Sequence, residues 1–121
     1  MKRRILIVED TPDNRQIMRD LLTSAGYELI EATDGEAGVA AAFEHRPDLI
    51  LMDIQLPVLD GYEATRRIKA NPATCAIPII AVTSYALSGD ETRARAAGCD
   101  RYVAKPFSPR QLLATVRETL P

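Results

Sequence analysis

The sequence contains no tryptophan, and cysteine, histidine and phenylalanine are scarce in it. Its 121 residues include two cysteines, one histidine and two phenylalanines, while 46% are hydrophobic, so the core must be mainly aliphatic. Cys75 and Cys99 lie far apart and form no CxxC pattern, which argues against a zinc site or a disulfide framework. We expect both thiols to be buried or half-buried in a reducing compartment.

No apolar run comes close to the roughly 20 residues that a membrane-spanning helix needs. The basic start, Lys2 to Arg4, is not followed by the apolar segment of a signal peptide. With a net charge of -2, the chain also lacks the basic excess that is typical of nucleic-acid and anionic-membrane binders. We therefore expect a soluble, cytoplasmic protein with no nucleic-acid or membrane partner, folded as one domain over residues 1–121.

Five short segments have the composition of β-strands. Three are continuous apolar runs, which are typical of strands covered on both faces of a parallel sheet. Glu28–Ala32 mixes charged and apolar residues, and Tyr102–Ala104 is short, so both are expected at the edges of the sheet. The three apolar runs are Ile5–Val8, Leu49–Met52 and Ile79–Val82.

Helical patterns fill the gaps between these segments. Four of them open on a residue that commonly caps a helix: Thr11, Asp34, Ser88 and Ser108. The remaining helix covers about Tyr62 to Ala70. The expected ends are Gly26, the residues before Pro47, Asn71-Pro72 and Gly98. Strands that alternate with helices predict a parallel sheet with helices on both faces, which is a doubly wound α/β fold.

Polar side chains directly follow four of the predicted strands. Glu9 and Asp10 follow the first strand, and Asp53 follows the third. Thr83 follows the fourth strand and Lys105 the fifth. Ligands of an open parallel sheet bind at the carboxyl ends of its strands, so we expect these groups to converge at one edge.

Three converging carboxylates require positive charge nearby. Two carboxylates about 4 Å apart repel each other by roughly 4 kcal/mol at an effective dielectric constant near 20. Lys105 can supply one positive charge, and Mg²⁺, which binds carboxylates, water and phosphate oxygens, can supply the rest. Asp53 is then a candidate nucleophile for phosphoryl transfer, because an aspartyl carboxylate can form a covalent phosphoryl intermediate.

Four motifs taken together resemble the receiver domain of two-component response regulators. They are Ile5–Asp10, Leu51–Pro57 with Asp60-Gly61, Val82–Ser84 and Lys105–Phe107. The resemblance covers essentially the whole chain, in order and in spacing. It implies a flavodoxin-like, doubly wound three-layer sandwich, with five parallel strands in the order 2-1-3-4-5 and five helices.

The resemblance also implies roles for the residues at the predicted edge. Asp53 would accept a phosphoryl group and would hold Mg²⁺ together with Glu9 and Asp10. The backbone carbonyl of Gln55 would be a further metal ligand, and Lys105 would pair with the bound phosphoryl group.

A conformational switch on the last two strands is implied in the same way. Thr83 would turn toward the phosphoryl group, Tyr102 would change rotamer, and Pro106 would be a cis-proline. The surface formed by the fourth helix, fifth strand and fifth helix would then change. Taken alone, Thr83 is typical of a loop hydroxyl and Tyr102 of edge-strand packing, so these roles rest on the resemblance.

The phosphoryl donor is expected to be another molecule, because the single histidine, His45, lies near the end of the second predicted helix. The resemblance implies a sensor histidine kinase or a histidine phosphotransfer protein as donor. It implies a downstream protein effector, or relay of the phosphoryl group, as output, and a monomer or a phosphorylation-dependent homodimer. The predicted partner surface consists of Asn14, Ile17, Met18 and Pro106.

Two positions bear on how long the phosphoryl group would persist. Gln55 and Tyr85 stand where the family tunes dephosphorylation. Neither side chain is suited to aligning an attacking water as Asn or Glu would be. We therefore predict an acyl phosphate that hydrolyses slowly.

Two other functions fit parts of the pattern. A Mg²⁺-dependent phosphohydrolase would use Asp53 on an external substrate, but such enzymes usually carry a carboxylate where Gln55 stands. A flavodoxin-type binding module needs a glycine- or hydroxyl-rich phosphate loop after the first strand, whereas Thr11-Pro12-Asp13 is acidic there. We therefore expect a phospho-accepting signalling protein rather than an enzyme.

Overall fold

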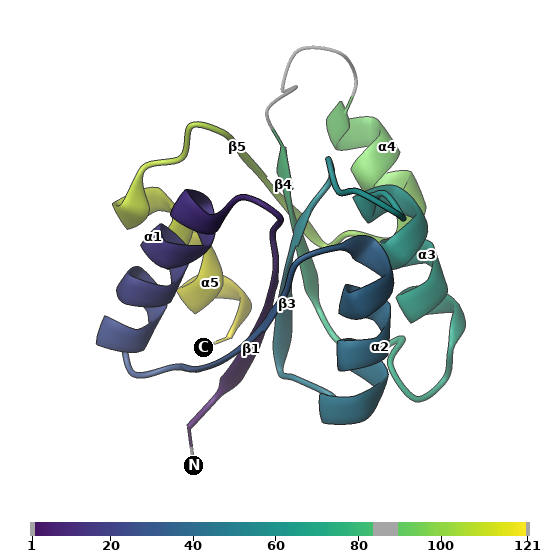
Figure 1. The fold of residues 1–121 in the computed structure, drawn as a ribbon, viewed down its shortest axis with the longest axis horizontal. Helices are drawn as coiled ribbons and strands as arrows, with labels where there is room; N and C mark the ends of the chain where they lie inside the picture. Colours follow the sequence, from purple (N-terminus) through teal and green to yellow (C-terminus); the bar gives the residue numbers. More distant parts are fainter. Residues whose placement is uncertain (1, 84–89, 121) are drawn as a thin grey trace.

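A computed structural model describes residues 2–83 and 90–120 of the chain. Within these residues, five parallel strands form one sheet in the order β2-β1-β3-β4-β5, with helices on both faces (Figure 1). The predicted fold and strand order are confirmed. The strands are β1 (Arg4–Val8), β2 (Glu28–Ala32), β3 (Leu49–Asp53), β4 (Ile79–Thr83) and β5 (Arg101–Ala104). The helices are α1 (Pro12–Ser24), α2 (Gly35–His45), α3 (Gly61–Ala70), α4 (Asp90–Ala97) and α5 (Pro109–Thr119).

Alternate side chains of the strands enter two separate hydrophobic cores. Ile5 and Ile7 of β1 pack in the core under α1 and α5, whereas Leu6 and Val8 pack in the core under α2, α3 and α4. Figure 1 shows these two groups of helices on opposite sides of the sheet. Because successive side chains of a strand point to opposite faces, a continuous apolar run serves both cores at once. Among the described helices, none is long and apolar enough to cross a bilayer.

Two of the four predicted helix caps form side-chain capping bonds in the described residues. The side chains of Asp34 and Ser108 accept hydrogen bonds from backbone N–H groups in the first turns of α2 and α5. Thr11 occupies the N-cap position of α1, but its side chain makes no capping bond. Gly26 follows the end of α1 with a φ of +95°, a conformation that glycine adopts without strain. The predicted start of α4 at Ser88 lies outside the described residues.

The strands differ from the expected bounds by single residues at their ends. β1 begins at Arg4 and β5 at Arg101, β4 extends through Thr83, and β3 extends through Asp53. The last difference matters because the Asp53 carboxylate belongs to a strand whose five residues are all buried. β2 and β5 are the edge strands, as their composition predicted.

The two cysteines differ in exposure. Cys99 is buried, as expected, but Cys75 is exposed, so the prediction is wrong for Cys75. The reason is that Cys75 lies in the connection between α3 and β4, outside both cores.

Alkylation of the folded protein is expected to modify Cys75 alone. Burial raises the pKa of the Cys99 thiol, so little thiolate forms there and reagents do not reach it. Iodoacetamide followed by mass measurement should show one adduct in buffer and two in denaturant. Cys75→Ser should show no adduct in buffer, and equally fast labelling of Cys99 would contradict the burial of that residue.

Candidate functional site

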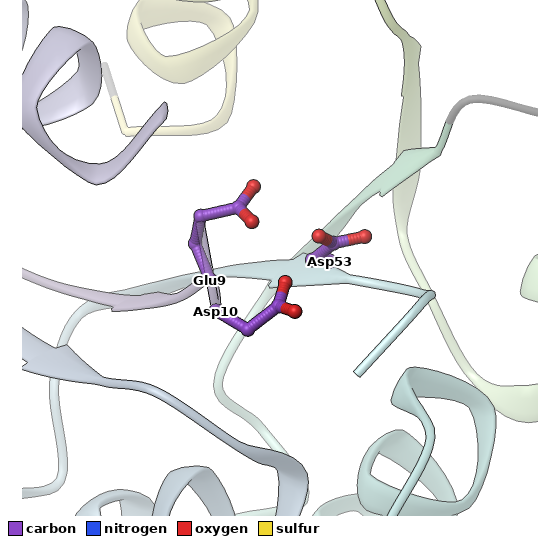
Figure 2. Close-up of side chains that lie close together, drawn as sticks. All are labelled: Glu9, Asp10 and Asp53. Carbon is purple, nitrogen blue, oxygen red and sulfur yellow. The ribbon is translucent and has the colours of Figure 1, made fainter. Parts of the chain in front are cut away.

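The polar residues predicted to converge do meet at the carboxyl ends of β1, β3 and β5. Glu9 and Asp10 directly follow β1, Asp53 ends β3, and Lys105 directly follows β5. Glu9, Asp10 and Asp53 each offer a carboxylate oxygen, and these oxygens lie within 4.8 Å of one another. Figure 2 shows the three carboxylates turned toward one region beside the end of β3. Glu9 and Asp53 are buried, and Asp10 is exposed.

Lys105 bridges the two buried carboxylates. Its Nζ lies 2.9 Å from Glu9 Oε1 and 2.9 Å from Asp53 Oδ2. Burial alone would lower the pKa of Lys105, but the hydrogen bonds to Glu9 and Asp53 outweigh it, and the pKa is raised. The ammonium is therefore charged at neutral pH and balances part of the carboxylate charge.

Backbone N–H groups hold the other oxygens of these two carboxylates. Thr11 N donates to Glu9 Oε2 at 3.1 Å, and Gln55 N donates to Asp53 Oδ1 at 3.0 Å. The carboxylate that ends β3 is thus fixed on both oxygens, by Lys105 and by the loop that follows it. Rigid placement of this kind favours a reactive group over an accidental surface charge.

Gly61 brings the start of α3 close to the end of β3. Its N–H donates to the Ile54 carbonyl at 2.9 Å, and a Cβ at this position would lie 2.3 Å from the carbonyl oxygen of Asp53. Because no side chain fits in that space, glycine lets the loop return directly beside Asp53.

Sequence reasoning missed Arg15, which contacts the acidic loop. Its Nη1 donates to the carbonyl oxygens of Glu9 and Asp10, at 3.0 Å and 3.2 Å. Its Nε lies 3.6 Å from Glu31 Oε1 on the neighbouring strand β2. The only signal in the sequence was a basic residue in the first turns of the helix that follows the acidic pair.

Thr83 and Tyr102 lie on the neighbouring strands. Thr83 is the last residue of β4 and is fully buried, and its carbonyl accepts the Lys105 N–H at 2.6 Å. Tyr102 pairs with Ala81 in the sheet register and packs against the core under α2, α3 and α4. Tyr85, the second position expected to tune dephosphorylation, lies outside the described residues. The Lys105-Pro106 peptide bond is cis, as expected.

The residues predicted to face a partner divide into two groups. Asn14, Ile17 and Pro106 line one surface hollow together with Lys105. Met18 does not belong to this surface: it is 1% exposed and packs in the core under α1 and α5, so that prediction is wrong. The physical reason is the rotation of α1, which points Met18 at the sheet and leaves the adjacent Ile17 46% exposed.

The donor set suits a hard divalent cation. Mg²⁺ prefers oxygen ligands, and three carboxylates lie close enough to bind one ion. Because Asp10 is exposed, water can also reach an ion bound there. Zinc and copper sites rely on cysteine or histidine, and neither occurs in this cluster.

A parallel five-stranded sheet with acidic residues and a lysine at its carboxyl edge is the architecture of a signalling receiver. The chain belongs to the response regulator receiver domain family, whose model matches residues 5–117. Receiver domains are the response-regulator modules of two-component signalling.

Individual relatives match along nearly the whole chain. The polar-differentiation response regulator DivK of Brucella anthropi is 44% identical over 120 residues, which are 99% of this chain and 98% of the relative. The receiver domain of the sensor histidine kinase PA1611 from Pseudomonas aeruginosa PAO1 is 42% identical, with a TM-score of 0.92 over 99% and 98% of the two chains. That crystal structure has a magnesium ion coordinated in its active site cleft. The chemotaxis protein CheY4 of Vibrio cholerae is 29% identical, with a TM-score of 0.92 over 98% and 99%.

Proposed function

We propose that Asp53 accepts a phosphoryl group from the phosphohistidine of a sensor histidine kinase or of a histidine phosphotransfer protein, in the cytoplasm. The observation that carries this proposal is the convergence of three carboxylates and Lys105 at the carboxyl edge of the sheet. Family membership and the magnesium ion in the Pseudomonas receiver support it.

The metal would be held by Glu9, Asp10 and Asp53, with the backbone carbonyl of Gln55 as a further ligand. Bound Mg²⁺ supplies positive charge to the oxygens of the phosphoryl group. The fit rests on the oxygen chemistry and the spacing of the three carboxylates.

The transfer itself needs an ionised and well-placed carboxylate. An oxygen of Asp53 attacks phosphorus, the P–N bond to the donor imidazole breaks, and the imidazole departs with the bonding electron pair. Lys105, already 2.9 Å from Asp53 Oδ2, can then pair with a phosphoryl oxygen. The donor is external, because His45 ends α2 at the amino edge of β3, away from Asp53.

The phosphoryl group would act as a switch through the neighbouring strands. Its added negative charge would draw Lys105 and the hydroxyl of Thr83, and Tyr102 would change rotamer as Thr83 moves. The surface formed by α4, β5 and α5 would then bind a protein effector, favour a homodimer, or precede relay of the phosphoryl group. Moving such a switch from 1:99 to 99:1 takes about 5.5 kcal/mol, which a few charge-assisted contacts can supply.

The hollow next to Lys105 is the proposed contact for the donor protein. Asn14, Ile17 and Pro106 surround it, and Ile17 is a large apolar side chain that is 46% exposed. A donor placed there would bring its phosphohistidine to the edge of the sheet where Asp53 lies.

Incubation with an acyl phosphate or a phosphorylated donor protein tests the proposal. With Mg²⁺, the chain should take up one phosphoryl group per molecule, and with EDTA it should take up none. Continuous release of phosphate from a phosphate monoester would instead favour a phosphohydrolase. Absence of any phosphorylation across a panel of donors would contradict the proposal.

The bound phosphoryl group is expected to persist for longer than seconds. Gln55 lies two residues beyond Asp53, and its side chain is exposed. It has neither a carboxylate nor a short amide with which to align a water for attack on the phosphoryl group. Decay of radiolabelled protein in Mg²⁺ buffer measures the lifetime. Gln55→Asn should shorten it, and complete loss of label from the parent within seconds would contradict the expectation.

A further inference from the structure

Glu9 and Asp10 pose a geometric problem for a metal site, because they are consecutive residues after a strand. Successive side chains of an extended strand point to opposite faces, so two neighbouring carboxylates would normally diverge. Here both reach the same cluster, with oxygens within 4.8 Å of each other and of Asp53 (Figure 2). The Glu9 N–H still donates to the Ala32 carbonyl of β2 at 3.1 Å, and the chain bends at Asp10, so the backbone leaves the strand conformation at these two residues.

A single guanidinium holds the backbone where it leaves the strand. Arg15 Nη1 donates to the carbonyl oxygens of both Glu9 and Asp10, at 3.0 Å and 3.2 Å. The Arg15 side chain is 17% exposed, so these bonds are partly shielded from water. Both peptide groups are thereby fixed while their side chains turn toward Asp53.

The guanidinium is in turn held by the edge strand. Arg15 Nε lies 3.6 Å from Glu31 Oε1, and Glu31 accepts two hydrogen bonds of 2.8 Å from Arg19. The hydrogen bond from Arg19 lowers the pKa of Glu31, so its carboxylate is charged at neutral pH. Because Glu31 pairs with Ile7 in the sheet, this contact ties Arg15 to the last residues of β1.

From these contacts we infer that Arg15 is a positioning residue for the magnesium site. It touches neither the metal ligands' carboxylates nor a substrate in the described contacts, and it acts by fixing the carbonyls of Glu9 and Asp10. The role of Arg15 rests on the proposed function, because it presupposes that these carboxylates bind Mg²⁺.

Charge and positioning make opposite predictions for loss of the guanidinium. A positive charge beside a cation site repels the cation, so its removal should tighten Mg²⁺ binding if charge alone matters. If Arg15 positions the acidic loop, its removal should weaken Mg²⁺ binding. Loss of a residue that orients metal ligands typically lowers metal affinity about tenfold or more. The sign of the change therefore separates the two effects.

Calorimetric titration of Mg²⁺ into the full chain, at fixed pH and ionic strength, tests this role. Arg15→Met, which keeps the aliphatic stem, should bind Mg²⁺ about tenfold more weakly than the parent. Arg15→Lys keeps the charge but holds the two carbonyls less fully, so its Mg²⁺ affinity should lie between those of the parent and Arg15→Met. Arg101→Met removes an exposed arginine that pairs with Glu118 at the start of β5, at the sheet edge opposite the three carboxylates, and should change the Mg²⁺ affinity by less than about twofold because solvent and salt screen that charge.

Urea unfolding in EDTA completes the experiment by measuring stability without metal. Unchanged or tighter Mg²⁺ binding by Arg15→Met would overturn the positioning role, whether or not its unfolding free energy falls. Equal weakening of Mg²⁺ binding in Arg15→Met and Arg101→Met would overturn it as well. If the parent bound no Mg²⁺, the proposed metal site and the role of Arg15 would both be refuted. If the parent bound Mg²⁺ and was phosphorylated, but Arg15→Met bound Mg²⁺ equally well, only the role of Arg15 would be refuted.

Discussion

Asp53→Asn is expected to lose all detectable phosphorylation while remaining folded. The substitution keeps the size of the side chain, but a neutral amide lacks the anionic oxygen that attacks phosphorus. Asp53 is 3% exposed, and Lys105 and the Gln55 N–H each hold one of its oxygens, so the attacking group has a fixed position that the amide does not restore. Labelling with a radioactive donor in Mg²⁺, followed by gel analysis, measures the effect.

Asp48, at the opposite end of β3, provides the matched control. Asp48 is exposed just before β3 and accepts the Arg4 N–H at 2.8 Å, a bond that the amide oxygen of Asn can also accept. Asp48→Asn should therefore be labelled as well as the parent. Persistent labelling of a folded Asp53→Asn would refute Asp53 as the acceptor.

Lys105→Met is expected to make stability depend strongly on Mg²⁺. The change leaves Glu9 and Asp53, which are 1% and 3% exposed, without their bridging ammonium. Loss of one partner from a buried ion pair typically destabilises a protein by about 3 kcal/mol or more, so the variant should lose roughly that amount in EDTA. Added Mg²⁺ should restore much of the loss, because the cation supplies the missing positive charge.

The direction of the pH effect follows from the pKa of Lys105. Hydrogen bonds to Glu9 and Asp53 outweigh burial and raise that pKa. The contribution of Lys105 to stability is therefore fully present below the ordinary lysine pKa and is lost as pH rises through the raised value. At neutral pH the parent retains all of this contribution, so the comparison with Lys105→Met is cleanest there.

Lys69→Met provides the control for loss of a partly buried lysine. Lys69 is 19% exposed and bonds to Asp100 and to the Ile77 carbonyl, away from the carboxylate cluster. Its replacement should lower stability by the same amount with and without Mg²⁺. Equal Mg²⁺ stabilisation of Lys105→Met, Lys69→Met and the parent would contradict the proposed link between Lys105 and the metal site.

The architecture could be predicted because its signals are local in the sequence. Apolar runs such as Leu49–Met52 are continuous since their residues serve two cores at once, and Asp34 and Ser108 cap helices that begin directly after them. The end of β3 was harder to predict, because the apolar run ends at Met52 whereas the pairing with β4 continues through Asp53.

The acidic cluster could be predicted, but the contacts that hold it could not. The carboxyl-edge rule places Glu9, Asp10 and Asp53 together without reference to coordinates. The bonds from Arg15 to two carbonyls, and from Lys105 to Glu9, depend on side-chain direction and on backbone that has left the strand.

The prediction that Met18 faces a partner was wrong for a related reason, whereas Ile17 is exposed as expected. A helical stripe that is wide in sequence does not indicate which edge faces the sheet, and only the packing of α1 distinguishes buried Met18 from exposed Ile17. The error for Cys75 has another cause: the expected helix end at Asn71-Pro72 and strand start at Ile79 already place this residue in a connection, and the expectation of burial rested on residue type alone.

The decisive measurement is the position of the phosphoryl group on the chain. The protein would be phosphorylated in Mg²⁺, treated with borohydride to reduce an acyl phosphate, digested, and sequenced by mass spectrometry. We expect the reduced residue to be Asp53 and EDTA to prevent the modification. Reduction at another aspartate or glutamate, or phosphorylation that is independent of Mg²⁺, would contradict this expectation.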